Sequence, residues 1–292
     1  MGIELSQPKN NLKDKLSVII LCAGKGTRLK KITKNLPKPL IKIESLNNSS
    51  ILNYTINSLL KLEIKKIAIV VGYLGDIIRK VISILLEENH SLQDKLIIID
   101  TKNQYKLGSL YSFLSITTNK LFFNPNFNYL LIPGDTIFEL PLLEEILSII
   151  SKNFKLIQSY PFTFYRKIDL DTFKEFYRGK NSISVAEVEE IGLEMNLKKI
   201  YQVKLKNFYS KEEINQLIPL FVFNYRIINE ILKLKKKVPV KTVWESLNYV
   251  IENKKKVFAF EVESNYNFTD IDSIEDLTNF NKKKKEDNRR SD

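Results

Sequence analysis

The sequence is poor in cysteine and histidine, with one of each among its 292 residues. A single cysteine, Cys22, excludes an internal disulfide framework and a zinc site built from several cysteines. It ends an apolar run, so we expect a small core residue and not a redox centre. The lone His90 lies in the polar stretch 87–91 and is expected on the surface.

Long apolar runs are also missing. No stretch approaches the ~20 residues that a membrane span needs. The polar segment 1–15 lacks the apolar core of a secretory signal, and we treat it as an N-terminal extension. These absences predict a cytoplasmic protein that does not associate with a membrane.

Acidic residues are outnumbered, since 46 lysines and arginines face 34 aspartates and glutamates, for a net charge of +12. The positive charge is spread along the chain, with short lysine runs at 235–237, 254–256 and 282–285. None is interleaved with aromatic residues, as a single-stranded nucleic-acid site requires, so no nucleic-acid partner is expected. The last run belongs to residues 281–292, which predict a disordered basic tail.

Strands and helices alternate in the first half of the chain. Apolar runs predict strands at 18–22, 66–71, 96–99 and 129–132, with helices at 74–86, 107–116 and 142–150. This order indicates an α/β fold whose parallel sheet is covered on both faces. After about residue 155, strands at 183–188, 197–203, 217–223 and 256–262 and helices at 225–234, 243–251 and 273–280 predict a mixed or antiparallel extension. Because no linker divides the chain, we expect one domain over residues 16–280.

The first predicted strand ends in a glycine loop. Ala23-Gly24-Lys25-Gly26-Thr27 is followed by the cations Arg28 and Lys38, the latter within Leu-Pro-Lys-Pro-Leu. Glycines let backbone N–H groups turn toward an anion, and arginine adds a fork of donors matched to phosphate. The spacing fits neither the P-loop nor the dinucleotide fingerprint. An ordinary turn with surface charges is the alternative, but the complete string favours a nucleoside triphosphate.

Two acidic segments could serve a metal ion. Asp135 directly follows a buried strand and Gly134, at the sheet edge where ligands bind, although Pro-Gly-Asp is also common turn chemistry. Mg²⁺ prefers one or two carboxylates with water and phosphate oxygens. The second segment is Asp270-Ile-Asp272-Ser-Ile-Glu-Asp, part of which could cap a helix: Asp272 or Ser273 as N-cap, with Glu275 or Asp276 completing a capping box.

The glycine loop, the Pro-Lys-Pro segment, Gly-Asp and the terminal Asp segment together resemble the sugar-phosphate nucleotidyltransferases, the nucleotide-sugar pyrophosphorylases. The resemblance implies a Rossmann-like three-layer α/β/α fold with a mixed, mostly parallel central sheet. It implies that residues 23–27 wrap the triphosphate and that Arg28 and Lys38 are catalytic. It also implies that Asp135 and Asp270 hold Mg²⁺, with Asp272 as the alternative to Asp270.

The same resemblance suggests where the base and the acceptor bind. The loop 103–110 would read the base, with Gly108 allowing close approach and Gln104 or Ser109 bonding its edge; a helix N-terminus is the alternative. Lys204 is the candidate for the acceptor phosphate, although the expected Glu-Lys-Pro is absent. Tyr111-Ser112-Phe113 is nearer to the phospho-alcohol cytidylyltransferases, which share the fold.

The function predicted from these features is transfer of a nucleoside monophosphate from a nucleoside triphosphate to a sugar 1-phosphate, giving a nucleotide sugar and pyrophosphate. Alternatives are a cytidylyltransferase that acts on a phospho-alcohol and a catalytically silent subunit of the same fold. A glycosyltransferase, which would use an Asp-x-Asp metal motif near mid-chain, is disfavoured because the string at 169–171 is expected to have no preceding strand and the string at 270–272 lies near the end of the chain. The expected partners are a nucleoside triphosphate and a small phosphate monoester, and a homo-oligomer is left open.

Overall fold

The computed structural model describes residues 12–169, 171, 182–192, 194–204, 213–234, 239–263 and 266–291, with backbone only at 13, 30, 31 and 283–291. Most of the N-terminal extension and the lysine run at 235–237 therefore lie outside the described residues. None of the described helices combines the length and the apolar character that a membrane span needs. The cytoplasmic location stays a prediction.

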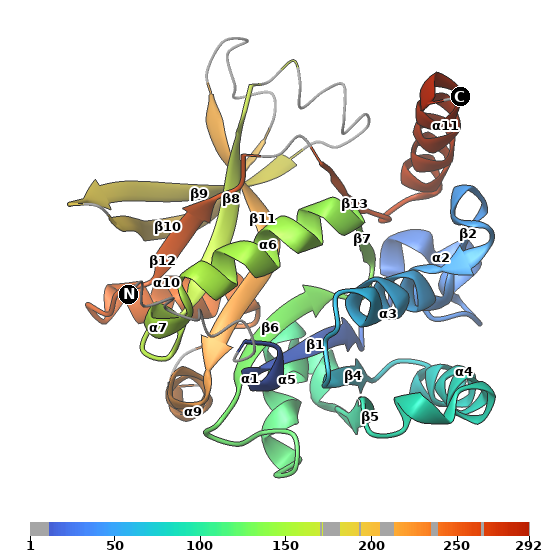
Figure 1. The fold of residues 1–292 in the computed structure, drawn as a ribbon, viewed down its shortest axis with the longest axis horizontal. Helices are drawn as coiled ribbons and strands as arrows, with labels where there is room; N and C mark the ends of the chain where they lie inside the picture. Colours follow the sequence, from blue (N-terminus) through green and yellow to red (C-terminus); the bar gives the residue numbers. More distant parts are fainter. Residues whose placement is uncertain are drawn as a thin grey trace, which may run out of the picture.

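The centre of the fold is a nine-stranded sheet in the order β5-β4-β1-β6-β11-β8-β12-β10-β9 (Figure 1). Its first half is parallel: β1 pairs with β4 and β6, and β4 pairs with β5. These strands are β1 (Leu16–Cys22), β4 (Ile67–Val71), β5 (Leu96–Asp100) and β6 (Asn128–Pro133). β1 and β4 read as nearly continuous apolar runs because both of their faces are buried, which matches the sequence prediction.

The second half of the sheet is largely antiparallel. Strand β11 runs antiparallel to β6 on one side and to β8 on the other, and β10 runs antiparallel to β9 and β12. Among the described strands of this half, β12 and β8 are the one parallel pair. The strands are β8 (Phe162–Ile168), β9 (Ser182–Ile191), β10 (Glu194–Lys204), β11 (Ile214–Asn224) and β12 (Phe258–Glu261). The sheet is therefore mixed, but the expectation of a mostly parallel sheet holds only for its first half, since β9 and β10 form a hairpin.

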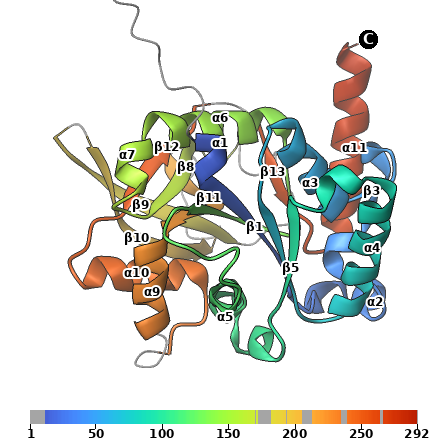
Figure 2. The same ribbon diagram turned by 60° about the horizontal axis from the view of Figure 1, so that its bottom comes forward.

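Helices lie on both faces of this sheet because successive strand residues point to opposite sides. Val18 and Ile20 pack in one apolar cluster with α3, α4 and α6, whereas Ile19 packs in another with α5, α9 and α10. Figure 2 shows α6 on one side of the sheet and α5, α9 and α10 on the other. The mixed α/β class is confirmed. The helices are α1 (Leu12–Lys15), α2 (Lys30–Thr33), α3 (Ile51–Lys61), α4 (Gly75–Glu88), α5 (Ser109–Leu114), α6 (Leu140–Lys152), α7 (Phe154–Ile157), α9 (Tyr225–Leu234), α10 (Val243–Glu252) and α11 (Ile274–Ser291).

Two small sheets complete the fold. Strand β2 (Lys42–Ile43) pairs with β3 (Ser49–Ser50), and β7 (Thr136–Phe138) pairs with β13 (Phe268–Asp270), both antiparallel. The second pair brings a segment from near the end of the chain against the end of β6. It is this pair, which the sequence did not predict, that positions the acidic residues of the candidate site.

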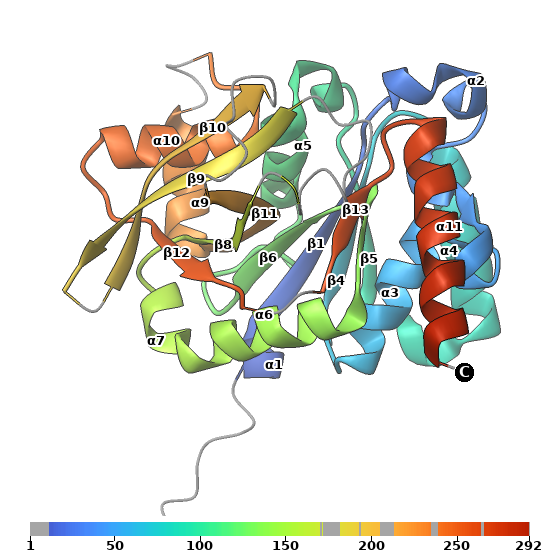
Figure 3. The same ribbon diagram turned by 90° about the horizontal axis from the view of Figure 1, so that it is seen from above.

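The C-terminal segment differs from its prediction. Residues 281–291, expected as a disordered tail, continue helix α11, which Figure 3 shows as one straight helix. The apolar residues Leu277 and Phe280 anchor its first turns against a small apolar cluster. The lysines, arginines and glutamate that follow are good helix formers, so the helix extends beyond its packed part. The division of the chain at residues 15 and 280 otherwise stays a prediction.

Candidate active site

The carboxyl ends of β1, β4 and β6 meet at one edge of the sheet, as the sequence predicts. The Gly134 N–H donates to the Leu21 carbonyl at 2.9 Å, and a Cβ on Gly134 would lie 2.6 Å from the Cys22 Sγ. From β4, the Tyr73 N–H donates to the Ala23 carbonyl at 3.2 Å. Cys22 is buried, and burial together with the Asp135 carboxylate raises the pKa of its thiol. It is thus a neutral core residue, in agreement with the prediction.

The glycine loop leaves this edge toward solvent. Ala23 is buried, whereas Gly24, Lys25, Thr27 and Arg28 are exposed. Apart from the chain neighbours of Gly24, none of the described residues has an atom within 4 Å of a Cβ built there, so this part of the backbone is open to a ligand.

Gly26 folds the loop back onto the segment that carries Lys38. Its φ is +59°, in the left-handed region, and a Cβ there would lie 3.0 Å from Thr33 Cγ2 and 3.3 Å from Lys38 Cβ. The Thr33 hydroxyl donates to the carbonyls of Gly26 and Leu29 at 2.9 and 3.0 Å. The two predicted cationic segments are therefore in direct contact through a glycine that tolerates both the dihedral and the crowding.

Lys38 is the centre of the site. Its Nζ lies 2.7 Å from Asp135 Oδ2 and 2.8 Å from Asp272 Oδ1, and Asp272 also pairs with Arg28 at 2.7 Å. The Lys38 side chain is only 7% exposed, whereas that of Arg28 is 74% exposed. Burial by itself would lower the pKa of Lys38, but the two carboxylates outweigh it and raise the pKa above its ordinary value. The ammonium is therefore a permanent buried charge.

Asp270 takes a different position from Asp272. It lies opposite Thr136 in the β13–β7 pair and accepts a hydrogen bond from the Thr136 hydroxyl. The chain then leaves the strand, the Ile271 N–H donates to the Asp135 carbonyl at 3.2 Å, and Asp272 reaches Lys38. The structure therefore joins Asp135 through Lys38 to Asp272, which the sequence ranked second, and not to Asp270.

The capping alternative also holds for part of this segment. The Ser273 hydroxyl accepts from the Asp276 N–H at 3.0 Å, and Asp276 Oδ2 accepts from the N–H groups of Asp272 and Ser273 at 2.9 and 2.8 Å. Ser273 and Asp276 thus form a capping box at the start of α11. This box fixes the backbone of Asp272 and leaves its carboxylate to the site.

The residues present suit a hard cation. The carboxylates of Asp135 and Asp272 both contact the Lys38 ammonium, so they lie close together. Mg²⁺ commonly binds one or two protein carboxylates, and phosphate oxygens and water complete its coordination shell. The part of the chain that the structure describes holds no group of three or more His, Cys, Asp or Glu able to bind a metal ion. The donor set therefore fits a metal shared with a substrate better than an all-protein metal centre.

The predicted base loop lies along the same edge. Gln104 begins a 3₁₀ turn after β5, Gly108 directly precedes α5, and Ser109 is the first residue of that helix. The side chains of Gln104 and Ser109 are exposed. Gly108 has φ +129°, and a Cβ there would lie 2.4 Å from the Lys241 carbonyl. A packing constraint therefore explains this glycine, and its role toward a base stays a prediction.

Lys204 is the last residue of β10 and is exposed, opposite Ser182 on the outermost strand. Its side chain reaches neither Lys38, Asp135 nor Asp272 through any hydrogen bond or ion pair among the described residues. Its role toward an acceptor phosphate stays a prediction.

Sequence reasoning missed Arg166, which contacts the segment that leads into the site. It is 7% exposed in β8, donates to Gln216 Oε1 at 2.8 Å and to Asn267 Oδ1 at 3.2 Å, and lies 5.3 Å above the Phe268 ring. It also donates to the Tyr266 carbonyl at 3.1 Å. Arg166 thus fixes the segment that leads into β13 and Asp272. The available signal was a charged residue in an apolar, aromatic stretch, FTFYRKI.

Part of the chain resembles known nucleotidyltransferases in sequence. Residues 17–162, half of the chain, match the family model for nucleotidyl transferase. The chain is 40% identical over 68 residues to the 2-aminoethylphosphonate cytidylyltransferase of Lancefieldella rimae, covering 23% of this chain and 26% of that one. It is 39% identical over 64 residues to the CTP:phosphoglutamine cytidylyltransferase of Campylobacter jejuni, covering 22% and 24%. The chain thus matches about a quarter of the length of these curated relatives.

The structural similarity to known proteins covers more of the chain than the sequence similarity does. A crystal structure of UDP-glucose pyrophosphorylase complexed with UDP-glucose superposes with a TM-score of 0.67, at 16% identity, over 94% of this chain and 99% of that one. At such low identity the similarity establishes the fold alone. The matched residues 17–162 include the glycine loop, Lys38 and the Gly134-Asp135 segment. From this match we conclude that the chain belongs to the nucleotidyl transferase family.

Proposed function

We propose that this protein transfers a nucleoside monophosphate from a nucleoside triphosphate to a sugar 1-phosphate and releases pyrophosphate, on a Rossmann-like three-layer core. The observation that carries the proposal is Lys38, bonded to both Asp135 and Asp272 and packed against the glycine loop at the carboxyl edge of the sheet. Substrates of open α/β sheets bind at this edge.

The main obstacle to such a reaction is repulsion between the reactants, which carry roughly −4 and −2 charge. The exposed guanidinium of Arg28 pairs with Asp272 and follows the glycine loop, where it can hold the departing pyrophosphate. The buried ammonium of Lys38 lies deeper, where it can stabilise negative charge that develops on the transferred phosphoryl group. The acceptor phosphate is itself the nucleophile, so the reaction needs no general base.

The proposal includes Mg²⁺, which Asp135 and Asp272 would hold. When bound, the ion neutralises phosphate charge and orients the reacting oxygens. We choose Asp272 over Asp270 because its carboxylate shares Lys38 with Asp135, whereas Asp270 accepts a hydrogen bond from Thr136.

The second candidate is cytidylyl transfer to a phospho-alcohol. Two relatives with local similarity are cytidylyltransferases, and the chain carries Tyr111-Ser112-Phe113 after the predicted base loop. A catalytically silent subunit of the same fold is the third reading, and only turnover separates it from the other two.

The deciding experiment measures pyrophosphate release with Mg²⁺, testing UTP, dTTP, CTP, GTP and ATP against sugar 1-phosphates and phospho-alcohols. Release that depends on one nucleotide and one acceptor identifies both substrates. Asp135→Ala is expected to abolish that release while the protein stays folded, which its circular dichroism spectrum checks. Silence across the panel, from protein that still binds a nucleotide, would favour the silent subunit.

A further inference from the structure

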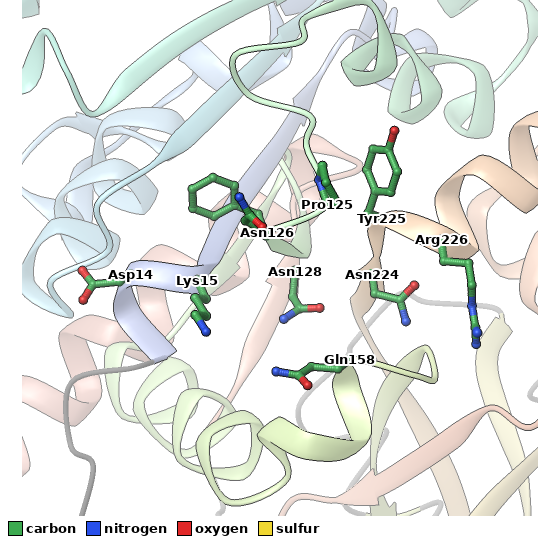
Figure 4. Close-up of a pocket in the computed structure, with 10 residues that line it drawn as sticks. Asp14, Lys15, Pro125, Asn126, Asn128, Gln158, Asn224, Tyr225 and Arg226 are labelled. Carbon is green, nitrogen blue, oxygen red and sulfur yellow. The ribbon is translucent and has the colours of Figure 1, made fainter.

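A cavity lies at the end of the sheet opposite to the candidate active site. It has a volume of about 650 Å³ and is formed where β1 and β6 begin and β11 ends (Figure 4). The glycine loop follows the other end of β1, which contains seven residues. At the usual rise per residue, the cavity and the candidate active site are therefore about 20 Å apart. A ligand here would not contact Lys38.

The floor of the cavity contains two asparagines that face each other across the β6–β11 pair, Asn128 and Asn224. Both ends of the Asn224 amide are hydrogen-bonded within the protein. Its Oδ1 accepts from the Ile227 N–H at 2.9 Å, and its Nδ2 donates to the Ile157 carbonyl at 3.2 Å. Asn224 thereby caps the start of α9.

Asn128 differs from its neighbour. It is only 5% exposed, yet its side-chain amide has no hydrogen-bond partner among the residues that the structure describes. Figure 4 shows this amide directed into the space between Lys15, Gln158 and Asn224. The amide atoms of Asn128 are not among the described side-chain atoms that are fully buried without a partner, so they face the cavity itself and offer a ligand one donor group and one acceptor.

The electrostatics of the cavity favour an anion. Lys15 and Arg226 line it, and α9, a helix of 10 residues, begins there with the positive end of its dipole. One N–H of Arg226 donates to the Ser159 carbonyl at 3.1 Å. The lining also contains the acid Asp14, but its carboxylate pairs with Lys65, which is outside the lining.

We propose that this cavity binds a small phosphate monoester that carries hydroxyl groups, at a site separate from the nucleotidyl-transfer centre. The phosphate would lie between Lys15 and Arg226, and the hydroxyls would bond the amides of Asn128 and Gln158. The volume falls within the range of about 300–1,000 Å³ usual for small-molecule sites. The proposal does not depend on the proposed function of the other edge.

The test measures binding of ribose 5-phosphate to the full chain by titration calorimetry, without nucleotide and with chelator present. Ribose is the matched ligand without the phosphate. We expect saturable binding of ribose 5-phosphate and none of ribose. Lys15→Met and Arg226→Met should each weaken binding by about threefold to tenfold, as the loss of a charged partner implies. Asn128→Leu should weaken it by at least as much.

Two control variants make the test specific. Lys61→Met removes an exposed lysine on α3, outside the cavity lining, and should leave binding unchanged. Arg28→Met alters the other edge and should also leave it unchanged. Absence of saturable binding, equal binding of ribose, or binding that Arg28→Met removes while Asn128→Leu retains it, would each overturn the proposal. A melting curve of each variant distinguishes lost binding from lost folding.

Discussion

At the scale of single residues, Lys38 joins three distant segments of the chain. Its ammonium bonds Asp135 and Asp272, which lie 97 and 234 positions away in the sequence. A buried cation between two carboxylates holds the acids in place, and under the proposed function it would also keep positive charge where the phosphates react.

Replacing Lys38 by methionine should lower kcat/KM for nucleotidyl transfer by about a hundredfold or more, because the loss of a preorganised charged donor costs this much in comparable sites. Pyrophosphate release on the active substrate pair measures it. Lys42→Met, an exposed lysine four residues further along the chain, is the matched control and should retain activity. Near-normal turnover by the Lys38 variant would exclude Lys38 from the reaction.

The two aspartates of the terminal segment should respond differently to the same change. We expect Asp272→Asn to lower kcat by about a hundredfold and to raise the Mg²⁺ concentration needed for half-maximal rate, because it removes one of two carboxylates at the site. Asp270→Asn keeps a carbonyl oxygen that can accept the hydrogen bond from Thr136, so kcat should fall by less than about tenfold. Magnesium titrations of both variants measure this, and the reverse order would identify Asp270 as the metal ligand.

At the scale of elements, the turn after β6 packs closely against the end of β1. Gly134→Ala would place a Cβ 2.6 Å from Cys22 Sγ and 2.7 Å from the Leu21 carbonyl, so the strands must separate. We expect the free energy of unfolding to fall by about 1–3 kcal/mol, as overpacking does. In Gly24→Ala the new Cβ has no described atom within 4 Å beyond its chain neighbours. The free energy of unfolding of this variant should stay within about 0.5 kcal/mol of that of the wild type. Urea denaturation measures both variants, and equal stabilities would contradict the packing argument.

The start of α10 provides a prediction with a pH dependence. Thr242 and Glu245 form a capping box, in which Glu245 Oε2 accepts from the N–H groups of Lys241 and Thr242 at 2.9 and 2.7 Å. Burial would raise the pKa of Glu245, but these hydrogen bonds outweigh it and lower the pKa below its ordinary value of 4.5. The ionised carboxylate therefore stabilises the fold above pH 4.5, and this contribution is lost as the pH falls through the lowered pKa.

Glu245→Gln should thus reduce the free energy of unfolding by about 1 kcal/mol at neutral pH. The difference from the wild type should shrink as the pH falls below 4.5. Glu252→Gln, an exposed glutamate at the other end of the same helix, should show little effect at any pH. Denaturation curves at several pH values decide this, and a difference that does not depend on pH would contradict the role of the ionised carboxylate.

At the scale of the whole molecule, several buried groups make the fold sensitive to alkaline pH. Burial, followed by the nearby Glu261 carboxylate, raises the pKa of Tyr165 to about 12, and burial raises that of Tyr129 as well. The pKa of Lys38 is also raised. In each case the unfolded chain loses its proton at a lower pH than the folded chain does, so stability falls as the pH rises above 10.

Chemical denaturation at pH 9 and pH 11 should therefore show a clear loss of stability at the higher pH. Tyr165→Phe should reduce that loss because it removes one of the groups that titrate. Tyr266→Phe, which changes a tyrosine that is 47% exposed, is the control and should leave the loss unchanged. Equal stability of the wild type at both pH values would contradict the assignment.

The chain by itself determined the features that depend on neighbouring residues. Apolar, β-branched runs predicted β1 and β4, and the glycines predicted the open loop before Arg28. The apolar run before Gly134 placed Asp135 at the end of a buried strand, at the edge of the sheet where ligands bind. Helix α9 was predicted with its observed bounds, and the bounds of α10 to within one residue. Each of these depends on backbone dihedrals and periodicity within a few residues.

Only the tertiary structure decided which distant groups meet. That Asp272 pairs with Lys38, whereas Asp270 accepts from Thr136, follows from the register of β13 against β7. The position of Arg166 follows from its contact with the segment before β13. The sequence predicted a mixed or antiparallel extension, but which of its strands pair, and the position of Asn128 opposite Asn224, depend on how strands far apart in sequence meet. Such pairings are determined by packing and hydrogen bonding across the whole fold, so residue spacing along one sequence does not encode them locally.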